Sequence, residues 1–395
     1  MANDSTSPIV DLSDEELEQE TTNPIELEEL GDDADATFSN IAPPDRRLIT
    51  QPYDLAVSDL VNQVETDRLH LRPVYQRKYV WDNKKASKLV ESLLINVPIP
   101  VCYLVEESDG TRSVIDGQQR LRSLNRYLQN EFALTGLEVL AELNRKRFRQ
   151  LTDRQQRLIA NRTIRCIVIS EDSDPEIRFN VFERLNTGSV ALTAQELRNS
   201  VYRGSFNDLL RTLAKSSELS SCLGGRSDTR MAFEELVLRF FALNERLSDY
   251  RPSLKRFLND YMRTYRHLDE SGIDARQKLF SETAAKAHAV FNGNCFRRAT
   301  GTATEWAWLP QVNSAVYDVI MLNFARLSMT PTQLGDAADD IVDALVLLMF
   351  KNDDFADAIS LATGDRARLF RRVRLFAESL SALGLSSGLA GLSVE

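Results

Sequence analysis

The clearest periodic pattern in the sequence is an amphipathic stretch that begins near residue 82. In WDNKKASKLVESLLINVPIP, residues 81–100, five apolar residues recur at helical spacing: Ala86, Leu89, Val90, Leu93 and Leu94. Asp82 or Asn83 can cap the start of this helix, and Pro98 ends it. The pattern predicts a helix with one buried face.

Short runs rich in β-branched residues follow this helix. VCYLVEE (101–107) and RSVIDG (112–117) flank Ser108, Asp109 and Gly110, a sequence typical of a hairpin turn. TIRCIVISE (163–171) supplies a third strand. Strands mixed with amphipathic helices predict an α+β domain over residues 46–202.

The pattern becomes helical throughout after residue 202. Apolar residues at helical spacing fill four segments, at 230–243, 254–268, 313–327 and 336–350. GTATEWAWLP (301–310) is expected to be a loop with Trp306 and Trp308 as core anchors. The sequence therefore predicts a mixed domain followed by an all-α helical domain, residues 203–395.

Charge divides the chain unevenly. Residues 1–45 contain fourteen Asp or Glu and no Lys or Arg, which leaves 48 basic against 44 acidic residues for the remainder. A segment of this composition buries little and repels itself, so we predict a disordered acidic tail. It is either a solubilising extension or a segment that docks a partner or competes with nucleic acid for a basic groove.

Composition excludes several classes of protein. The 395 residues are 43% apolar and 27% charged, as in a globular protein of two or three domains. The chain lacks an apolar run of about 20 residues and the pattern of a signal peptide, so a cytoplasmic location is expected. The four single cysteines predict neither a disulfide framework nor a zinc site. The histidines, His70, His267 and His288, lie far apart, which argues against a histidine-metal nuclease on this chain.

The stretch VIDGQQRLRSL, residues 114–124, passes from a predicted strand straight into a predicted helix. In a purely structural interpretation, Asp116 is the N-cap and Gln119 completes a capping box. The buried stripe of the helix would then consist of Leu121, Leu124 and Leu128. This interpretation needs no ligand, but it does not account for Arg120.

Arg120 would stand in the first helical turn, where a cation costs a few tenths of a kcal/mol or more at the positive end of the helix dipole. That cost disappears if an anion binds there. A strand, a tight Gly117 turn and a helix N-terminus present backbone N–H groups, and an arginine fork beside them suits a phosphate. The sequence thus leaves a phosphate site and a structural arginine as alternatives. In the phosphate-site alternative, Arg120→Ala should spare the fold.

Two further stretches carry polar candidates. In RPVYQRKYVWDNKKASKL (72–89), Tyr75, Tyr79 and Trp81 are interleaved with the basic residues Arg77, Lys78, Lys84, Lys85 and Lys88. This composition fits either nucleic-acid contacts or a solvated face beside core aromatics. In FNVFERLNTGSVALTAQELRNS (179–200), a short helix ends at NTG, and Thr193 and Glu196 form a capping box. The loop between would expose polar residues that contact a nucleotide or a partner, unless turn chemistry alone explains them: Arg184, Asn186 and Thr187.

YQRKYVWDNKKASKLVESLLINVPIP, VIDGQQRLRSL and FERLNTGSVALTAQELRN, in this order, resemble the N-terminal domain of GmrSD-type modification-dependent restriction enzymes. That domain is related to the ParB and sulfiredoxin fold, and the resemblance covers residues 53–202. It implies a small ParB-like sheet with helices, a nucleoside triphosphate site and a role in defence against foreign DNA. The family's DGQQR motif falls on residues 116–120, and its QR falls on Gln76 and Arg77.

The resemblance and the residues together give a set of expected roles. Residues expected to act in nucleotide hydrolysis are Asp116, Gln118, Gln119 and Arg120. Residues expected to bind the nucleotide are Gln76, Arg77, Gly117, Arg120, Arg184 and Asn186. Residues expected to contact DNA are Lys78, Trp81, Lys84 and Lys85. Asp116 is the candidate ligand for Mg²⁺.

The resemblance has one gap. Restriction enzymes of this group usually carry an HNH-type nuclease centre, fused or on a partner, and the C-terminal half shows no such histidine arrangement. We therefore expect a nucleotide-binding, NTP-hydrolysing module that controls DNA binding or a separate HNH-type nuclease chain. The alternative is a non-enzymatic DNA-binding or adaptor protein. Whether the chain forms a homo-oligomer is left open by the sequence.

Overall fold

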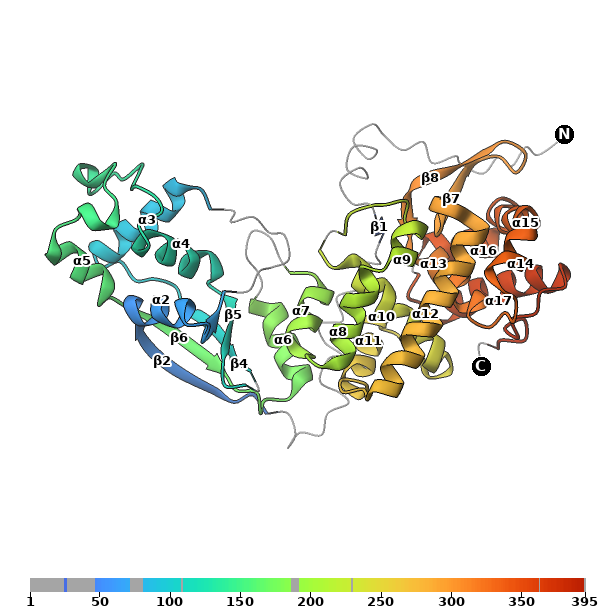
Figure 1. The fold of residues 1–395 in the computed structure, drawn as a ribbon, viewed down its shortest axis with the longest axis horizontal. Helices are drawn as coiled ribbons and strands as arrows, with labels where there is room; N and C mark the ends of the chain where they lie inside the picture. The colour runs from blue at the N-terminus through green and yellow to red at the C-terminus, as the bar shows by residue number, and fades with distance from the viewer. Residues whose placement is uncertain are drawn as a thin grey trace, which may run out of the picture. The chain divides into compact units, whose positions relative to one another are not determined.

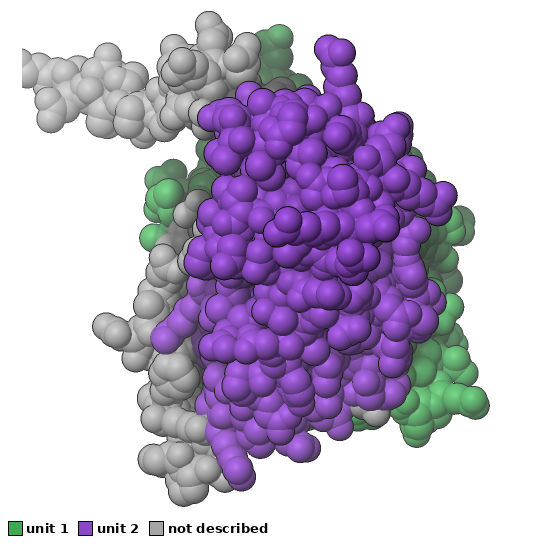
Figure 2. Space-filling model, turned by 90° about the vertical axis from the view of Figure 1, so that its left-hand side faces the viewer, with its two compact units in different colours: residues 1–33, 202–395 green, residues 34–201 purple. Residues whose placement is uncertain are grey.

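The computed structural model describes residues 25–26, 47–71, 81–107, 109–185, 192–228, 230–361 and 363–393. Its contacts divide the chain into two compact units, which Figures 1 and 2 show. Unit 2 runs from Ala34 to Val201, and unit 1 contains Tyr202–Glu395 together with the first 33 residues. A mixed sheet in one unit and a helical C-terminal region in the other confirm the predicted α+β class.

A five-stranded mixed sheet forms one layer of unit 2, in the order β2-β6-β4-β5-β3. The strands are β2 (Thr50–Ala56), β3 (Leu69–His70), β4 (Cys102–Glu106), β5 (Arg112–Asp116) and β6 (Thr163–Ile169). β4 pairs with β5 as the predicted antiparallel hairpin and runs parallel to β6. The three predicted strands are therefore confirmed, whereas β2 and β3 carried no pattern that we had identified.

Helices pack on one side of this sheet (Figure 1): α2 (Val57–Glu65), α3 (Asn83–Leu94), α4 (Gln118–Leu128) and α5 (Asp153–Ala160). β6 shows why, because Ile164, Cys166 and Val168 point into the core while Thr163 and Arg165 face solvent. Residues that alternate in this way give a strand one buried face. Two short 3₁₀ helices, Ala141–Leu143 and Phe148–Gln150, connect α4 to α5.

The predicted start of α3 is confirmed. The Asp82 side chain accepts a hydrogen bond from the backbone N–H of Lys85 at 2.7 Å, and the helix continues to Leu94. Further along, α6 (Pro175–Leu185) and α7 (Ala194–Val201) complete unit 2. The predicted Thr193 and Glu196 capping box at α7 is also confirmed, with backbone-to-side-chain hydrogen bonds of 2.7 and 3.2 Å.

Unit 1 consists mainly of helices: α8 (Ser205–Ala214), α9 (Ser217–Cys222), α10 (Ala232–Arg246), α11 (Leu254–Thr264), α12 (Glu270–Phe291), α13 (Ser314–Phe324), α14 (Pro331–Asp336), α15 (Ala338–Lys351), α16 (Asp353–Ser360) and α17 (Arg366–Ala382). α13 is buried along its whole length. Its Asp318 forms ion pairs of 2.6–2.7 Å with Arg239 of α10 and Arg372 of α17, all inside the core. This buried triad joins three helices that are distant in sequence.

The expectation of an all-α C-terminal domain is wrong in one place. β7 (Arg297–Gly301) and β8 (Trp306–Asn313) form an antiparallel hairpin where a loop was expected. Gly301, at φ +112°, lies at the end of β7 where the hairpin turns. Trp306 and Trp308 are half-buried and pack edge to face on one side of β8, while Ala307 between them is exposed. Alternation of this kind is typical of a strand, and our loop interpretation did not take it into account.

The acidic N-terminal segment also supplies a strand. β1 (Ile25–Glu26) pairs in parallel with β8, opposite Val312 and Asn313, and so extends the hairpin to three strands. For these two residues the prediction of a disordered tail is wrong, because backbone hydrogen bonds to a strand edge do not depend on side-chain hydrophobicity. Apart from β1, residues 1–45 lie outside the described residues.

No helix in the described part of the chain is long and apolar enough to cross a membrane.

Candidate functional site

The DGQQR segment forms a strand, a left-handed turn and a helix. Asp116 ends β5, Gly117 adopts φ +96°, and α4 starts at Gln118. A Cβ atom at Gly117 would lie 2.5 Å from the Cys102 Sγ atom, so both the backbone conformation and the close packing require glycine. The predicted capping box is wrong: Gly117 is the N-cap, and no side chain caps the helix.

Arg120 is held by three groups of its own chain. Its guanidinium donates to the Asp116 carboxylate at 2.7 Å and to the carbonyl of Val101 at 3.3 Å. It also donates to the carbonyl of Pro100. Only 12% of the Arg120 side chain is exposed. The guanidinium therefore ties the turn to the loop that precedes β4.

This arrangement supplies an internal anion for the arginine at the positive end of the helix. The Asp116 carboxylate, one turn before Arg120, offsets the unfavourable dipole interaction that had suggested a bound phosphate. Of the two alternatives left open by the sequence, these contacts favour a structural arginine. Arg120 would have to exchange at least one of these partners to grip a phosphate.

Asp116 is the more accessible partner, with 45% of its side chain exposed. One carboxylate together with substrate phosphates is a usual ligand set for Mg²⁺, so Asp116 fits the role of a single protein ligand. The described residues contain no cluster of three or more His, Cys, Asp or Glu that could hold a metal by itself. A metal here would therefore depend on the phosphates of a nucleotide.

The two glutamines of the motif differ in their surroundings. Gln118 and Gln119 are both half-buried on the first turn of α4. The Gln119 Oε1 atom is buried and has no hydrogen-bond partner. A buried amide oxygen without a partner costs free energy, so the Gln119 Oε1 atom is available to accept a hydrogen bond from a bound group or a water.

Cys102, which packs against Gly117, belongs to a pair of buried thiols. Cys102 and Cys166 lie opposite each other on the parallel strands β4 and β6, and both are fully buried. The hydrogen bond between the two thiols, together with burial, raises the pKa of the Cys166 thiol. All four cysteines are free and buried, which confirms them as small core residues.

The candidate DNA-binding residues around α3 that the structure describes are tied to neighbours. The Lys85 ammonium lies 4.9 Å from the centre of the Trp81 ring, and Trp81 packs against the core. The Lys84 side chain packs against Gly136, where an added Cβ atom would meet it at 2.7 Å. Trp81 is thus a half-buried aromatic that packs against the core and carries a cation over its face.

Several expected site residues cannot be placed. Gln76, Arg77, Lys78 and Asn186 lie outside the described residues. Arg184 is exposed in the last turn of α6. The structure therefore brings together residues 116–120 of the predicted set, all from the β5–α4 turn.

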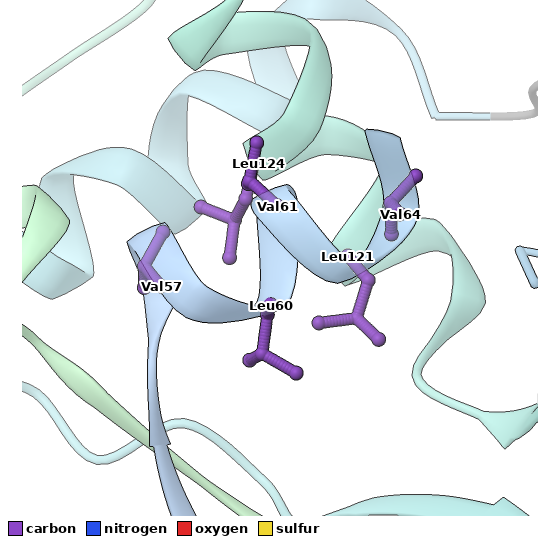
Figure 3. A pocket seen from close by; sticks show the side chains of 6 residues that line it. All are labelled: Val57, Leu60, Val61, Val64, Leu121 and Leu124. Atoms are coloured by element: carbon purple, nitrogen blue, oxygen red, sulfur yellow. The ribbon is translucent and has the colours of Figure 1, made fainter. Parts of the chain in front are cut away.

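A small recess between α2 and α4 is entirely apolar. Figure 3 shows the side chains that line it: Val57, Leu60, Val61, Val64, Leu121 and Leu124. None of these six side chains carries a polar atom, so the recess has no group that could bind a triphosphate. It belongs to the packing of α4 on α2 and not to the candidate site.

Comparison with known protein families identifies the domain that carries this turn. Residues 57–203 match the family described as GmrSD restriction endonuclease, N-terminal domain. These residues form a GmrSD N-terminal domain. The match runs from the start of α2 to just beyond α7 and includes the whole DGQQR segment. Comparisons with curated proteins and with solved structures give no match.

Sequence reasoning missed a basic segment within the GmrSD N-terminal domain. Residues 141–165 contain eight Arg or Lys and only two acidic residues, Glu142 and Asp153. Most of these basic residues are exposed on the connection to α5 and on α5 itself. A window of local charge along the chain would have found it, whereas our search for known motifs did not.

Proposed function

We propose that this chain is a nucleotide-binding, NTP-hydrolysing module of a restriction system, and that its nucleotide state controls DNA binding or a separate nuclease chain. The observation that carries the proposal is a GmrSD N-terminal domain whose DGQQR motif forms an uncapped strand–glycine–helix turn. The N-terminus of a helix attracts phosphate through its backbone N–H groups and its dipole.

In this proposal the residues of the turn have distinct roles. Gly117 lets the chain turn closely enough for phosphate to approach the start of α4. Arg120 positions the turn through the Pro100 and Val101 carbonyls, and it can exchange Asp116 for a phosphate. Asp116 would hold Mg²⁺, which when bound neutralises phosphate charge, and the Gln119 amide would orient a water.

The remaining predicted roles also belong to the proposal. Gln76, Arg77, Arg184 and Asn186 would contact the nucleotide, with Gln118 beside them at the start of α4. Lys78, Lys84, Lys85 and Trp81 would contact DNA. The nuclease of the system would be an HNH-type centre on another chain.

A second candidate is a DNA-binding or adaptor protein without enzymatic activity. One observation favours it: the Arg120 guanidinium already has partners, so the turn is complete without a nucleotide. In that case the motif is a structural element of the fold, and the basic surface of the domain carries the function.

Phosphate release separates these candidates. We predict that the purified chain releases phosphate from a nucleoside triphosphate with Mg²⁺ and that DNA changes the rate. Asp116→Asn should lower the rate at least about tenfold, because an amide keeps the hydrogen bond to Arg120 but loses the metal ligand. Asp109→Asn, at the tip of the β4–β5 hairpin, is the matched control and should leave the rate unchanged. Absence of phosphate release and of nucleotide binding by the wild-type chain would leave the second candidate.

A further inference from the structure

The end of unit 2 that carries α5 is strongly basic. Figure 2 faces this end of the molecule. The exposed arginines are Arg145, Arg147, Arg149, Arg154 and Arg157. We call these five residues the α5 patch. They come from the 3₁₀ segment at Phe148–Gln150, the residues before it, and α5.

The charges of the α5 patch are not neutralised by the domain. None of its arginines forms an ion pair with any other described residue, and only Arg147 donates a side-chain hydrogen bond, to the Asn130 carbonyl. Of the acidic groups nearby, Glu131 pairs with Arg126 and Glu138 with Lys88, while Glu142 and Asp153 are exposed and form no ion pair with the patch arginines. The patch therefore presents several exposed cations without an ion-pair partner among the described residues, all within residues 145–157.

Arg154, like Arg120, is a cation near the N-terminus of a helix, but it lacks a carboxylate partner such as Asp116 among the described residues. It lies in the first turn of α5, where a cation meets the positive end of the helix. Thr152 and Gln155 cap this helix with a capping box, and Asp153 is its only acidic residue. No carboxylate pairs with the Arg154 guanidinium among the described residues, so a bound anion would interact favourably with both this arginine and the positive end of α5.

The aromatic content of residues 141–165 indicates which kind of anion the α5 patch would bind. The only aromatic residue in 141–165 is Phe148, which is half-buried and packs edge-on against Tyr127 at 5.8 Å. Surfaces that bind single strands stack bases on aromatic side chains, and this surface offers none in its described residues. Arginines without rings suit the phosphates of a duplex, which need charge and hydrogen bonds only.

We infer that the α5 patch is a docking surface for the phosphate backbone of double-stranded DNA. The inference deepens the DNA-binding part of the proposed function and places it on elements other than the Asp116–Arg120 turn and the lysines of α3. Contacts of this kind are independent of base sequence. They hold the domain on DNA while another part of the system reads the sequence or the modification.

Duplex binding by charge-matched variants tests this inference. Arg154→Gln/Arg157→Gln removes two charges from the patch, whereas Lys278→Gln/Lys351→Gln removes two from exposed positions of unit 1. Fluorescence anisotropy with a labelled duplex, over a series of salt concentrations, gives the affinity and its salt dependence. The patch variant should bind at least about tenfold more weakly, and the slope of log K against log salt should fall by about 2. The control should match wild type.

Equal losses in both variants, an unchanged salt slope in the patch variant, or no duplex binding by wild type would each overturn the inference. Tighter binding of a single-stranded DNA or RNA of the same length would overturn the choice of duplex. Nucleotide titration of the same variants distinguishes a failure of this DNA-docking inference from a failure of the proposed nucleotide-binding function. A chain that binds duplex through the patch but binds no nucleotide keeps this inference and loses the NTP-hydrolysing role.

Discussion

Arg120 ties the β5–α4 turn to Asp116 and to the loop that precedes β4. Its place in a first helical turn was correctly identified, and so was its need for an anion. The anion proved to be Asp116, and the other partners are carbonyls of Pro100 and Val101, about twenty residues earlier. Those carbonyls become neighbours only when β4 pairs beside β5. Local sequence could not reveal them because the contact depends on sheet registry.

These contacts reverse our expectation for Arg120→Ala, which from sequence alone should have spared the fold. Removing the guanidinium leaves two carbonyls and a carboxylate without their donor, so we now expect a loss of roughly 1–3 kcal/mol in unfolding free energy. Leu124→Ala, in the core of the same helix, should cost roughly 2–5 kcal/mol. Arg154→Ala should stay within about 0.5 kcal/mol. Chemical denaturation of the three variants checks this order, and an Arg120→Ala variant as stable as Arg154→Ala would contradict it.

At the level of elements, the sequence predicted those whose signals are local. The helix at Asp82 and the capping box at Thr193 are confirmed because the capping side chain lies within four residues of its partner. The capping box at Asp116 failed because Gly117, in a left-handed conformation, continues the strand through Asp116 and takes the N-cap position itself. β1 had no signal, because a two-residue strand is formed by the edge to which it pairs.

β1 also changes what removal of the acidic segment should do. From charge alone, deletion of residues 1–45 should leave the melting temperature nearly unchanged. Because β1 pairs with β8, we expect the deletion to cost roughly 1–2 kcal/mol in unit 1, as backbone hydrogen bonds to the edge of β8 are lost. Deletion of residues 1–20 keeps β1 and is the control. Equal melting temperatures for both truncated chains and wild type would contradict a docked strand.

For the whole molecule, the sequence predicted the class of each part better than the chemistry of the site. Strands mixed with helices in the first domain, and a mainly helical C-terminal unit, follow from periodicity along the chain. The five residues of the DGQQR motif lie together because they are consecutive. The expected residues elsewhere gain no such support, and the α5 patch was missed because its arginines match no motif.

The central claim is that a nucleotide binds at the β5–α4 turn of the GmrSD N-terminal domain. Amide hydrogen exchange of the full chain, with and without a nucleoside triphosphate and Mg²⁺, tests this most directly. Binding at the helix N-terminus should slow the exchange of backbone amides at residues 117–121 while leaving those of α5, residues 153–160, unchanged. Unchanged exchange at residues 117–121 at saturating nucleotide, or protection confined to other elements, would contradict the claim.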